Sequence, residues 1–246
     1  MRLQLATWPQ VETYLKRSKA ILLPIGSTEQ HGPTGLIGTD ALCAEAVAVR
    51  VGEALEVMVA PTIAVGMAQH HMDFPGSMTL RPSTLMAVVK DCLLSLVRHG
   101  FERILLVNGH GGNVATVQAA FAETQMELDT RTPRPPLRAR LVNWWEMPAV
   151  DLLSAELYGD AVGHHATPPE LALTWALHPE TADPRPLQPR LAPRAAFHGA
   201  ADFRAQFPDG RIGSDPSLAR PQHGEQLLKV ATEEIAQVAR IFFTQA

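Results

Sequence analysis

A short apolar run passes directly into a glycine-rich turn in the stretch Arg103-Ile104-Leu105-Leu106-Val107-Asn108-Gly109-His110-Gly111-Gly112-Asn113. Such a run, closed by a turn, is typical of a strand buried in a parallel sheet. A helical pattern follows from about Val114 to Leu128, so this segment predicts a strand, a tight turn and a helix. The run from Ala20 to Gly26 is also apolar and closed by glycine, and it predicts a second buried strand.

Strand and helix patterns alternate through the first two thirds of the chain. Further helices are predicted from Thr7-Trp8-Pro9, from Thr39 or Asp40 to about Ala54, and from Leu85 to Gly100, and further strands near Val57 to Ile63 and from Arg138 to Asn143. This alternation predicts an α/β fold in which a parallel sheet is covered by helices on both faces.

The chain length of 246 residues fits one compact domain over residues 1–246 better than two domains. Residues 178–222 are rich in Pro, Arg, Gly and Asp and weakly periodic. We expect them to form a long irregular excursion, packed on the main body or on a neighbouring subunit. A last helix is predicted from Glu225 to Thr244.

Composition argues against several classes of partner. The formal net charge is −4, which disfavours a broad surface for nucleic acid or membrane. No apolar run reaches the ~18 residues of a membrane span, and the first residues lack the apolar core of an export signal. Cys43 and Cys92 fall in apolar-periodic stretches and are interpreted as buried apolar residues. We therefore expect a cytoplasmic protein that acts on a small molecule.

Two predicted strands end in polar clusters. The first is Gly26-Ser27-Thr28-Glu29-Gln30-His31-Gly32-Pro33, with Asp40 at the next helix start, and the second is Asn108 to Asn113 around His110. The carboxyl ends of parallel strands meet at one edge of a sheet, where sites of open α/β folds lie. Carboxylates and imidazoles together suit Zn²⁺ or Mn²⁺.

The spacing allows a two-metal site. Glu29 and His31 project to the same side of an extended segment, and Asp40 has two oxygens that can bridge two ions. We expect Glu29 on one ion and His31 with His110 on the other. Ordinary caps and a tight turn are the alternative for each motif alone. Nucleotide binding is disfavoured, because the glycine turn lacks both phosphate-loop spacings.

Four motifs in order give the chain a family resemblance. The segment Gly26 to Pro33 with Thr39-Asp40, then Phe74-Pro75-Gly76-Ser77, Asn108 to Asn113, and His165 followed five positions later by Glu170 resemble the motifs of the creatininase family. The resemblance covers about residues 5 to 175, with a weaker echo from Gly213 to Gly224.

The resemblance implies a three-layer αβα sandwich with a mainly parallel sheet, often assembled as homohexamers. It also implies a hydrolase of amide-type carbon–nitrogen bonds with two divalent metal ions, zinc first and manganese or iron as alternatives. The metal ligands would be Glu29, His31, Asp40 and His110. Glu170 would be a carboxylate at the second metal with a catalytic role, and His165 the proton shuttle.

Two positions depart from the family pattern. Gly112 stands where creatininases carry an acidic metal ligand. The usual His-Ala-Gly motif reads His165-Ala166-Thr167 in this chain, so Thr167 replaces its glycine. Either Glu170 supplies the missing ligand or one metal site is weak. The substrate is expected to be a cyclic amide, a formamide or a peptide-like molecule other than creatinine. The alternatives are a deformylase or peptidase-like enzyme of cofactor biosynthesis and a degenerate, non-catalytic metal-binding homologue.

Three further residues are candidates for substrate contact. His71 resembles a family position near the substrate pocket, although a hydrogen-bonded loop histidine explains it equally well. Ser77 is either a substrate contact or a loop serine bonded to backbone. Trp144 or Trp145 could wall a pocket, or lie in the core, and Trp144 is taken as the candidate.

Overall fold

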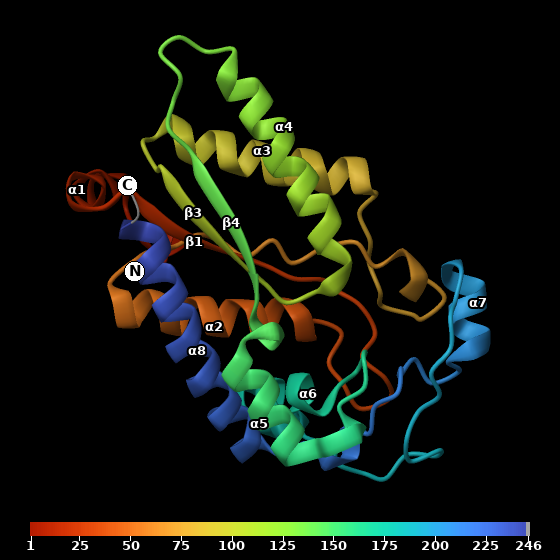
Figure 1. Cartoon of the computed structure of the whole chain (residues 1–246). Helices are drawn as coiled ribbons and strands as arrows, with labels where there is room; N and C mark the ends of the chain where they lie inside the picture. Colours follow the sequence, from red (N-terminus) through yellow and green to blue (C-terminus); the bar gives the residue numbers. More distant parts are fainter. Residues whose placement is uncertain (245–246) are drawn as a thin grey trace.

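The computed structural model describes residues 1–244, in which a sheet of four parallel strands lies between two layers of helices (Figure 1). The strands are β1 (Ala20–Ile25), β2 (Met58–Val59), β3 (Arg103–Asn108) and β4 (Arg138–Asn143), in the order β2-β1-β3-β4. β1 pairs with β3 from Ala20 opposite Arg103 to Ile25 opposite Asn108, and β3 pairs with β4 over its whole length. The predicted α/β class and three-layer arrangement are confirmed.

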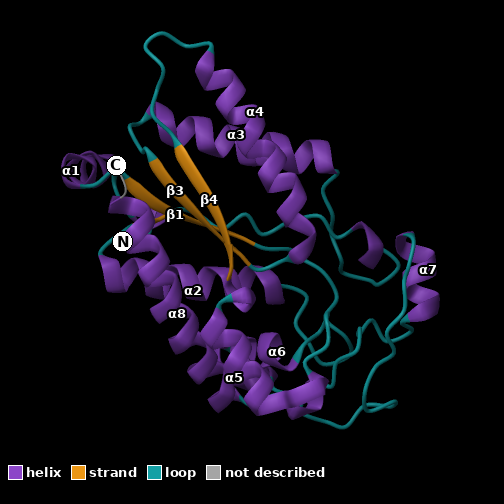
Figure 2. Cartoon of the chain, in the orientation of Figure 1, coloured by secondary structure: helices purple, strands orange, loops and turns teal. Residues whose placement is uncertain are grey.

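The helices divide between the two faces of the sheet (Figure 2). One face is covered by α1 (Trp8–Arg17), α3 (Pro82–Arg98) and α4 (Val114–Asp129). The other is covered by α2 (Thr39–Leu55) and α8 (Pro221–Thr244), against which α5 (Pro148–Tyr158) and α6 (Pro168–Leu177) pack. No helix within residues 1–244 is long and apolar enough to cross a membrane.

The central strands are apolar throughout because both of their faces are buried. Ile21, Leu23 and Ile25 face the α3 and α4 side, whereas Ala20 and Leu22 face α2 and α8. Side chains of a strand alternate between faces, so a strand covered on both sides has no polar face. Burying each of these larger side chains contributes about 2 kcal/mol.

The predicted strand near Val57 to Ile63 is wrong in length, since only Met58–Val59 forms β2. Pro61 has no backbone N–H and cannot continue the ladder. The chain returns to the sheet at Ile63, which makes one isolated bridge with Ile25. The last helix begins at Pro221, four residues before the predicted Glu225.

The segment 178–222 contains one complete α-helix, α7 (Gly199–Gln206), two short 3-10 helices, Pro179–Thr181 and Pro216–Leu218, and the start of α8, and is otherwise irregular. α7 packs on the short helix Gln69–His71, with Phe203 and Phe207 buried against Phe74. This contact places the excursion beside the carboxyl ends of the strands.

Arg211 holds the excursion together from inside. Its guanidinium has no exposed area and donates to the carbonyl oxygens of Pro189, Arg190 and Ser214 and to the carboxylate of Asp209. A buried charge is tolerated only when it is hydrogen-bonded in this way. The irregular segment is therefore tied to a defined position near the site.

Candidate metal centre

Five residues with oxygen or imidazole donors meet at the carboxyl ends of β1 and β3. Glu29 and His31 follow β1, and His110 follows β3. Asp40 lies in the first turn of α2 and Glu170 in the first turn of α6. Their ligand atoms fall into groups whose members lie within 4.8 Å of one another: Glu29 with Asp40 and His110, and His31 with Asp40 and Glu170. A third group of this kind joins Glu29 and His31 with the neighbouring His165.

Glycines at both strand ends let the backbone of α2 approach closely. A Cβ on Gly26 would lie 2.5 Å from the Cα of Ala41, and a Cβ on Gly109 would lie 2.8 Å from the carbonyl carbon of Asp40. No residue with a side chain fits at such distances. The two glycines therefore allow Asp40 to sit between the two strand ends.

Asp40 is the centre of the cluster, with one histidine on each of its oxygens. Nε2 of His31 lies 3.0 Å from Oδ1 of Asp40, and Nδ1 of His110 lies 3.1 Å from Oδ2. Nδ1 of His110 also lies 3.2 Å from Oε1 of Glu29. The two imidazoles thus face different oxygens of Asp40, an arrangement that favours one histidine on each ion over the expected pairing of both on one ion.

Backbone carbonyls orient both imidazoles toward Asp40. The Nε2–H of His110 donates to the carbonyl oxygen of Met67 at 2.8 Å, and the Nδ1–H of His31 donates to the carbonyl oxygen of Glu29 at 3.1 Å. The nitrogen nearer to Asp40 then carries either a proton shared with the carboxylate or, in the neutral ring, the lone pair that a metal ion would use. Metal-binding histidines are commonly held by a second hydrogen bond of this kind.

The cluster is buried and lacks partners for its polar atoms. Both carboxylate oxygens of Glu29, Nε2 of His31 and Oδ2 of Asp40 have no hydrogen-bond partner within residues 1–244. Burial and the charge of Asp40 raise the pKa of Glu29 to about 8. Burial alone would lower the pKa of His31, but the adjacent Asp40 outweighs it and raises the pKa to about 10.

These properties share one cause. Carboxylates placed together out of water need positive charge, and here the raised pKa values of His31 and His110 supply it as protons on the two imidazoles. A divalent cation would supply the same charge to the same atoms. The donor set and its unpartnered atoms therefore fit a metal centre.

Glu170 has two roles in the structure. One of its oxygens, Oε2, accepts hydrogen bonds from the backbone N–H and the hydroxyl of Thr167, both at 2.8 Å, as a capping box at the start of α6. Glu170 also offers a carboxylate oxygen to the group of possible metal ligands that it forms with His31 and Asp40. The cap thus holds the carboxylate beside the cluster.

Gly112 leaves no room for the acidic residue that the family pattern has there. A Cβ at this position would overlap Nε2 of His110 and would lie 2.5 Å from the carbonyl oxygen of Met67. An acidic residue at position 112 would therefore require movement of the turn, whereas the carboxylate of Glu170 already lies in the group with His31 and Asp40.

His165 and His71 lie beside the cluster, joined by Gln30. The Nε2–H of His165 donates to the carbonyl oxygen of Gln30 at 2.7 Å, and its Nδ1 lies 3.8 Å from Oε1 of Glu29. The side-chain amide of Gln30 donates to Nδ1 of His71 and to the carbonyl oxygen of Gly210, both at 2.9 Å. His71 in turn lies 3.2 Å from Glu29 through Nε2.

Burial lowers the pKa of both His71 and His165, so both imidazoles are neutral near pH 7. Gln30 was not among the predicted site residues. Its position between Glu29 and His31 was the available signal, but its partners lie far away in sequence and no pattern indicated them.

Ser77 is bonded to the backbone of a loop, which is the second of the two interpretations given for it above. Its hydroxyl accepts the backbone N–H of Gln30 at 3.1 Å, and it does not line the cavity. The serine instead supports the loop that carries Glu29 and His31.

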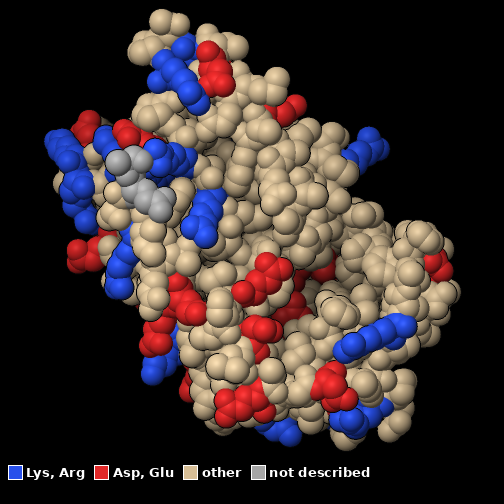
Figure 3. Space-filling model, viewed as in Figure 1, with Lys and Arg blue, Asp and Glu red and all other residues tan. Residues whose placement is uncertain are grey.

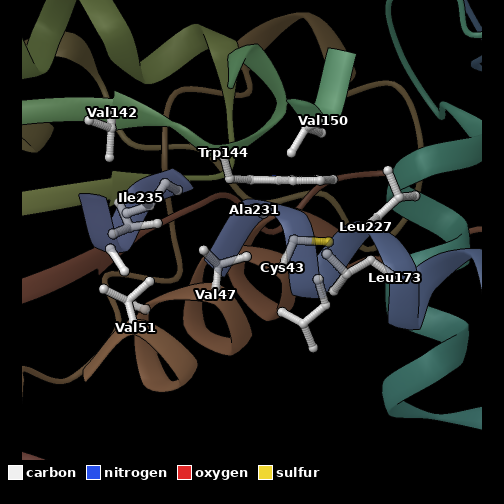
Figure 4. Close-up of a cluster of buried hydrophobic side chains, with 14 of the residues drawn as sticks. Cys43, Val47, Val51, Val142, Trp144, Val150, Leu173, Leu227, Ala231 and Ile235 are labelled. Carbon is white, nitrogen blue, oxygen red and sulfur yellow. The ribbon is translucent and has the colours of Figure 1, made fainter. Parts of the chain in front are cut away.

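Trp144 also lies elsewhere than expected. It has no exposed area, and Figure 4 shows its ring among Val150, Cys43 and Leu227 in the core beneath the sheet. Trp145, the neighbouring residue, lines the cavity. The two neighbouring tryptophans of this turn therefore face different sides. Cys43, which contacts the same core, is buried as an apolar residue as predicted.

A cavity of about 490 Å³ opens over the cluster. It is lined by Asp40, His110, His165 and Glu170 from the cluster region, together with residues of α5, the 162–164 segment and Phe197 of the excursion. The cavity is large enough for a small molecule. Figure 3 shows acidic side chains around this hollow, above α5.

Residues 4–239 match the creatininase family, which is described as creatinine amidohydrolase. The chain is 27% identical to a creatinine amidohydrolase of Pseudomonas putida over 257 residues, which cover 95% of this chain and 94% of that protein. It is 39% identical to a mycofactocin precursor peptide peptidase of Mycolicibacterium smegmatis over 113 residues, which cover 44% of this chain and 45% of that protein.

Solved structures agree in fold along the whole chain. A manganese form of creatininase has a TM-score of 0.89 at 26% identity and covers 99% of both chains. A mutant creatininase of the zinc–zinc type has a TM-score of 0.89 at 25% identity, covering 99% of this chain and 98% of that chain.

Proposed function

The chain belongs to the creatininase family, and from this premise we propose that it hydrolyses a carbon–nitrogen bond of a small amide with the help of two divalent metal ions. One observation carries the proposal. Asp40 lies with one imidazole nitrogen close to each of its oxygens, inside a buried cluster in which both carboxylate oxygens of Glu29 have no hydrogen-bond partner within residues 1–244.

Each ion has three candidate ligands from this chain. We assign Glu29, Asp40 and His110 to one ion and His31, Asp40 and Glu170 to the other, with Asp40 shared. This donor set suits zinc first and manganese or iron as alternatives. The manganese and zinc–zinc forms of relatives support both zinc and manganese as candidates.

Bound metal ions would polarise the amide carbonyl and lower the pKa of water to near neutrality. The residues of the chain supply the proton path. Burial keeps His165 neutral, and its Nε2–H is held by the carbonyl oxygen of Gln30, so Nδ1 is the atom free to accept a proton. His165 would pass this proton to the departing nitrogen as general acid.

A peptidase-like activity is the second candidate. The specific support is the 39% identity to a mycofactocin precursor peptide peptidase, which exceeds the 27% identity to creatinine amidohydrolase but covers less of the chain. Both activities require the same attack of water on an amide carbonyl. A homo-oligomer, hexameric by family resemblance, a cytoplasmic location and one domain over residues 1–246 stay predictions.

The test is the metal content per chain, by elemental analysis, of protein purified without chelator. We expect about two equivalents of transition metal in the wild type, by analogy with two-metal hydrolases, and a loss of at least one in Asp40→Ala. Asp91→Ala is the control, because Asp91 is exposed on α3, far from the cluster.

One equivalent in the wild type would leave a single-metal hydrolase and contradict the two-ion assignment. No metal after reconstitution with zinc or manganese would overturn the proposal and favour a degenerate homologue. Screening of cyclic amides, formamides and short peptides on the loaded protein then separates the two candidate activities.

A further inference from the structure

The side chain of Gln30 is buried, at 4% exposure, and the hydrolytic step described above gives it no part. Its Oε1 accepts the backbone N–H of Gly32 at 2.8 Å, and its Nε2 donates to the carbonyl oxygen of Gly210 at 2.9 Å. A backbone N–H only donates and a backbone carbonyl only accepts, so these two contacts determine which end of the amide is oxygen and which is nitrogen.

The amino group of Gln30 has three neighbours but only two hydrogens to donate. Besides the carbonyl oxygen of Gly210, Nδ1 of His71 and Nε2 of His165 each lie 2.9 Å away. Nε2 of His165 already carries a hydrogen, because it lies 2.7 Å from the backbone carbonyl oxygen of Gln30, which can only accept. The second amide hydrogen is therefore donated to Nδ1 of His71.

This hydrogen bond decides which nitrogen of His71 carries the proton. An imidazole that accepts at Nδ1 is neutral and has its proton on Nε2. Nε2 of His71 lies 3.2 Å from Oε1 of Glu29. The ring is held by the stacked ring of His165, at 4.3 Å between centroids, and by the ring of Phe203 at 4.8 Å. A protonated Nε2 has no lone pair for a metal ion, so His71 attracts the carboxylate of Glu29 and does not itself bind the ion.

We propose that Gln30 is a positioning residue of the metal centre, which acts through His71 to orient the carboxylate of Glu29. The inference rests on the proposed function, because Glu29 is a metal ligand there. It also links the excursion to the metal centre through Gly210. The φ of Gly210 is +85°, and a Cβ at this position would overlap the amide of Gln30, so glycine is required for this close approach.

The protonation of His71 is measured on its two ring nitrogens. The protein is labelled with isotope-enriched histidine, loaded with zinc and studied by solid-state nitrogen NMR, and the signals of His71 are assigned by their loss in His71→Phe. We expect a protonated Nε2 and an unprotonated Nδ1 that accepts a hydrogen bond. Gln30→Met keeps an unbranched side chain and adds no charge. In this variant the Nδ1 signal should move toward that of an imidazole nitrogen without a hydrogen bond.

The effect on metal binding is measured by zinc competition with a chromophoric chelator. Gln30→Met should lower the zinc affinity about tenfold, the lower end of the range for losing an orienting contact. In the His71→Phe background the same substitution should have almost no further effect, because the residue through which Gln30 acts is absent.

Gln125→Met is the matched control. The amide of Gln125 in α4 also donates to a backbone carbonyl, that of Leu137, but it does so beside the start of β4, at the end of the sheet away from the metal cluster. This variant also loses an amide hydrogen bond, yet it should leave both the His71 signals and the zinc affinity unchanged.

A proton on Nδ1 of His71 in the wild type would overturn the inference, since Nε2 would then be free to bind an ion itself. An equal fall in zinc affinity with and without His71 would also overturn it, because Gln30 would then act only by supporting the loop at Gly32. Both results leave the metal centre intact. If the wild type binds no zinc, the proposed function fails, and the positioning of a metal ligand fails with it.

Discussion

Adjacent glycines in the turn after β3 allow a sharp test of how the chain holds His110. Gly111 and Gly112 lie in the same short helix, Gly111–Asn113, and neither has a positive φ, so alanine suits the backbone at both. Their surroundings differ. A Cβ on Gly111 meets nothing within 4 Å, whereas a Cβ on Gly112 would overlap the imidazole of His110 and the carbonyl oxygen of Met67.

The magnitudes follow from these contacts. Gly111→Ala should stabilise the protein by about 0.4–1 kcal/mol, because alanine reduces the entropy of the unfolded chain. Gly112→Ala gains the same entropy but forces His110 away from Met67. Overpacking costs about 1–3 kcal/mol and the broken hydrogen bond about 1 kcal/mol, so Gly112→Ala should destabilise by about 1–3 kcal/mol.

The loss should also appear in metal binding. The hydrogen bond from His110 to Met67 orients Nδ1 toward Asp40 and Glu29. Losing an orienting bond of this kind lowers metal affinity by about 10- to 100-fold. We expect this decrease for Gly112→Ala and no change for Gly111→Ala, measured by zinc competition with a chromophoric chelator and by urea unfolding of the metal-free proteins.

Equal behaviour of the two variants in both assays would refute the reasoning. It would mean that the turn relaxes freely around a new methyl group and that the Met67 contact does not position His110. A loss of stability in Gly112→Ala without a loss of zinc affinity would refute only the second part.

Two further outcomes are expected. Trp144→Ala should lower the free energy of unfolding by about 3–5 kcal/mol, because its ring is wholly buried, and should have little effect on how tightly the zinc-loaded protein binds a small metal-chelating hydroxamate. Trp145 lines the cavity, so Trp145→Ala should change the affinity for the same hydroxamate more than it changes the stability. Burial lowers the pKa of His70 to about 4 from 6.5. As the pH falls, the unfolded chain therefore binds a proton at His70 before the folded chain does, so the free energy of unfolding should be highest above pH 6.5 and fall toward pH 4. Urea unfolding over this pH range should show a smaller fall for His70→Gln than for the wild type. An identical fall in both would contradict the burial of His70.

The strands and helices with strong local patterns were predictable. β1 and β3 are apolar because both faces are buried, and a run of that kind is visible in the sequence without any partner. The length of β2 was overestimated, because the prediction followed the apolar run and did not take into account that Pro61 has no N–H to continue the strand pairing. No prediction covered α5, although Pro148 at its first position was a start signal.

The site was predictable in its residue types but not in its contacts. Asp40 was expected to bridge, and it does face an imidazole on each side. Which histidine faces which oxygen depends on the carbonyls of Met67 and Glu29, and these are placed by turns that carry no signature. Likewise, the alternation of neighbouring side chains could not decide whether Trp144 or Trp145 faces the cavity.

The sequence by itself determined the α/β class, the strand ends at which polar clusters lie, and the family to which their motifs belong. Those properties follow from local periodicity and from residue types at short spacing, and both can be read from the order of residues along the chain. Only the tertiary structure decided that Gln30 joins His71 to His165, that Glu170 lies beside His31 and Asp40, and that α5 lines the same cavity as the metal cluster. Each of these contacts joins residues distant in sequence, and their geometry is set by how the layers pack on the sheet.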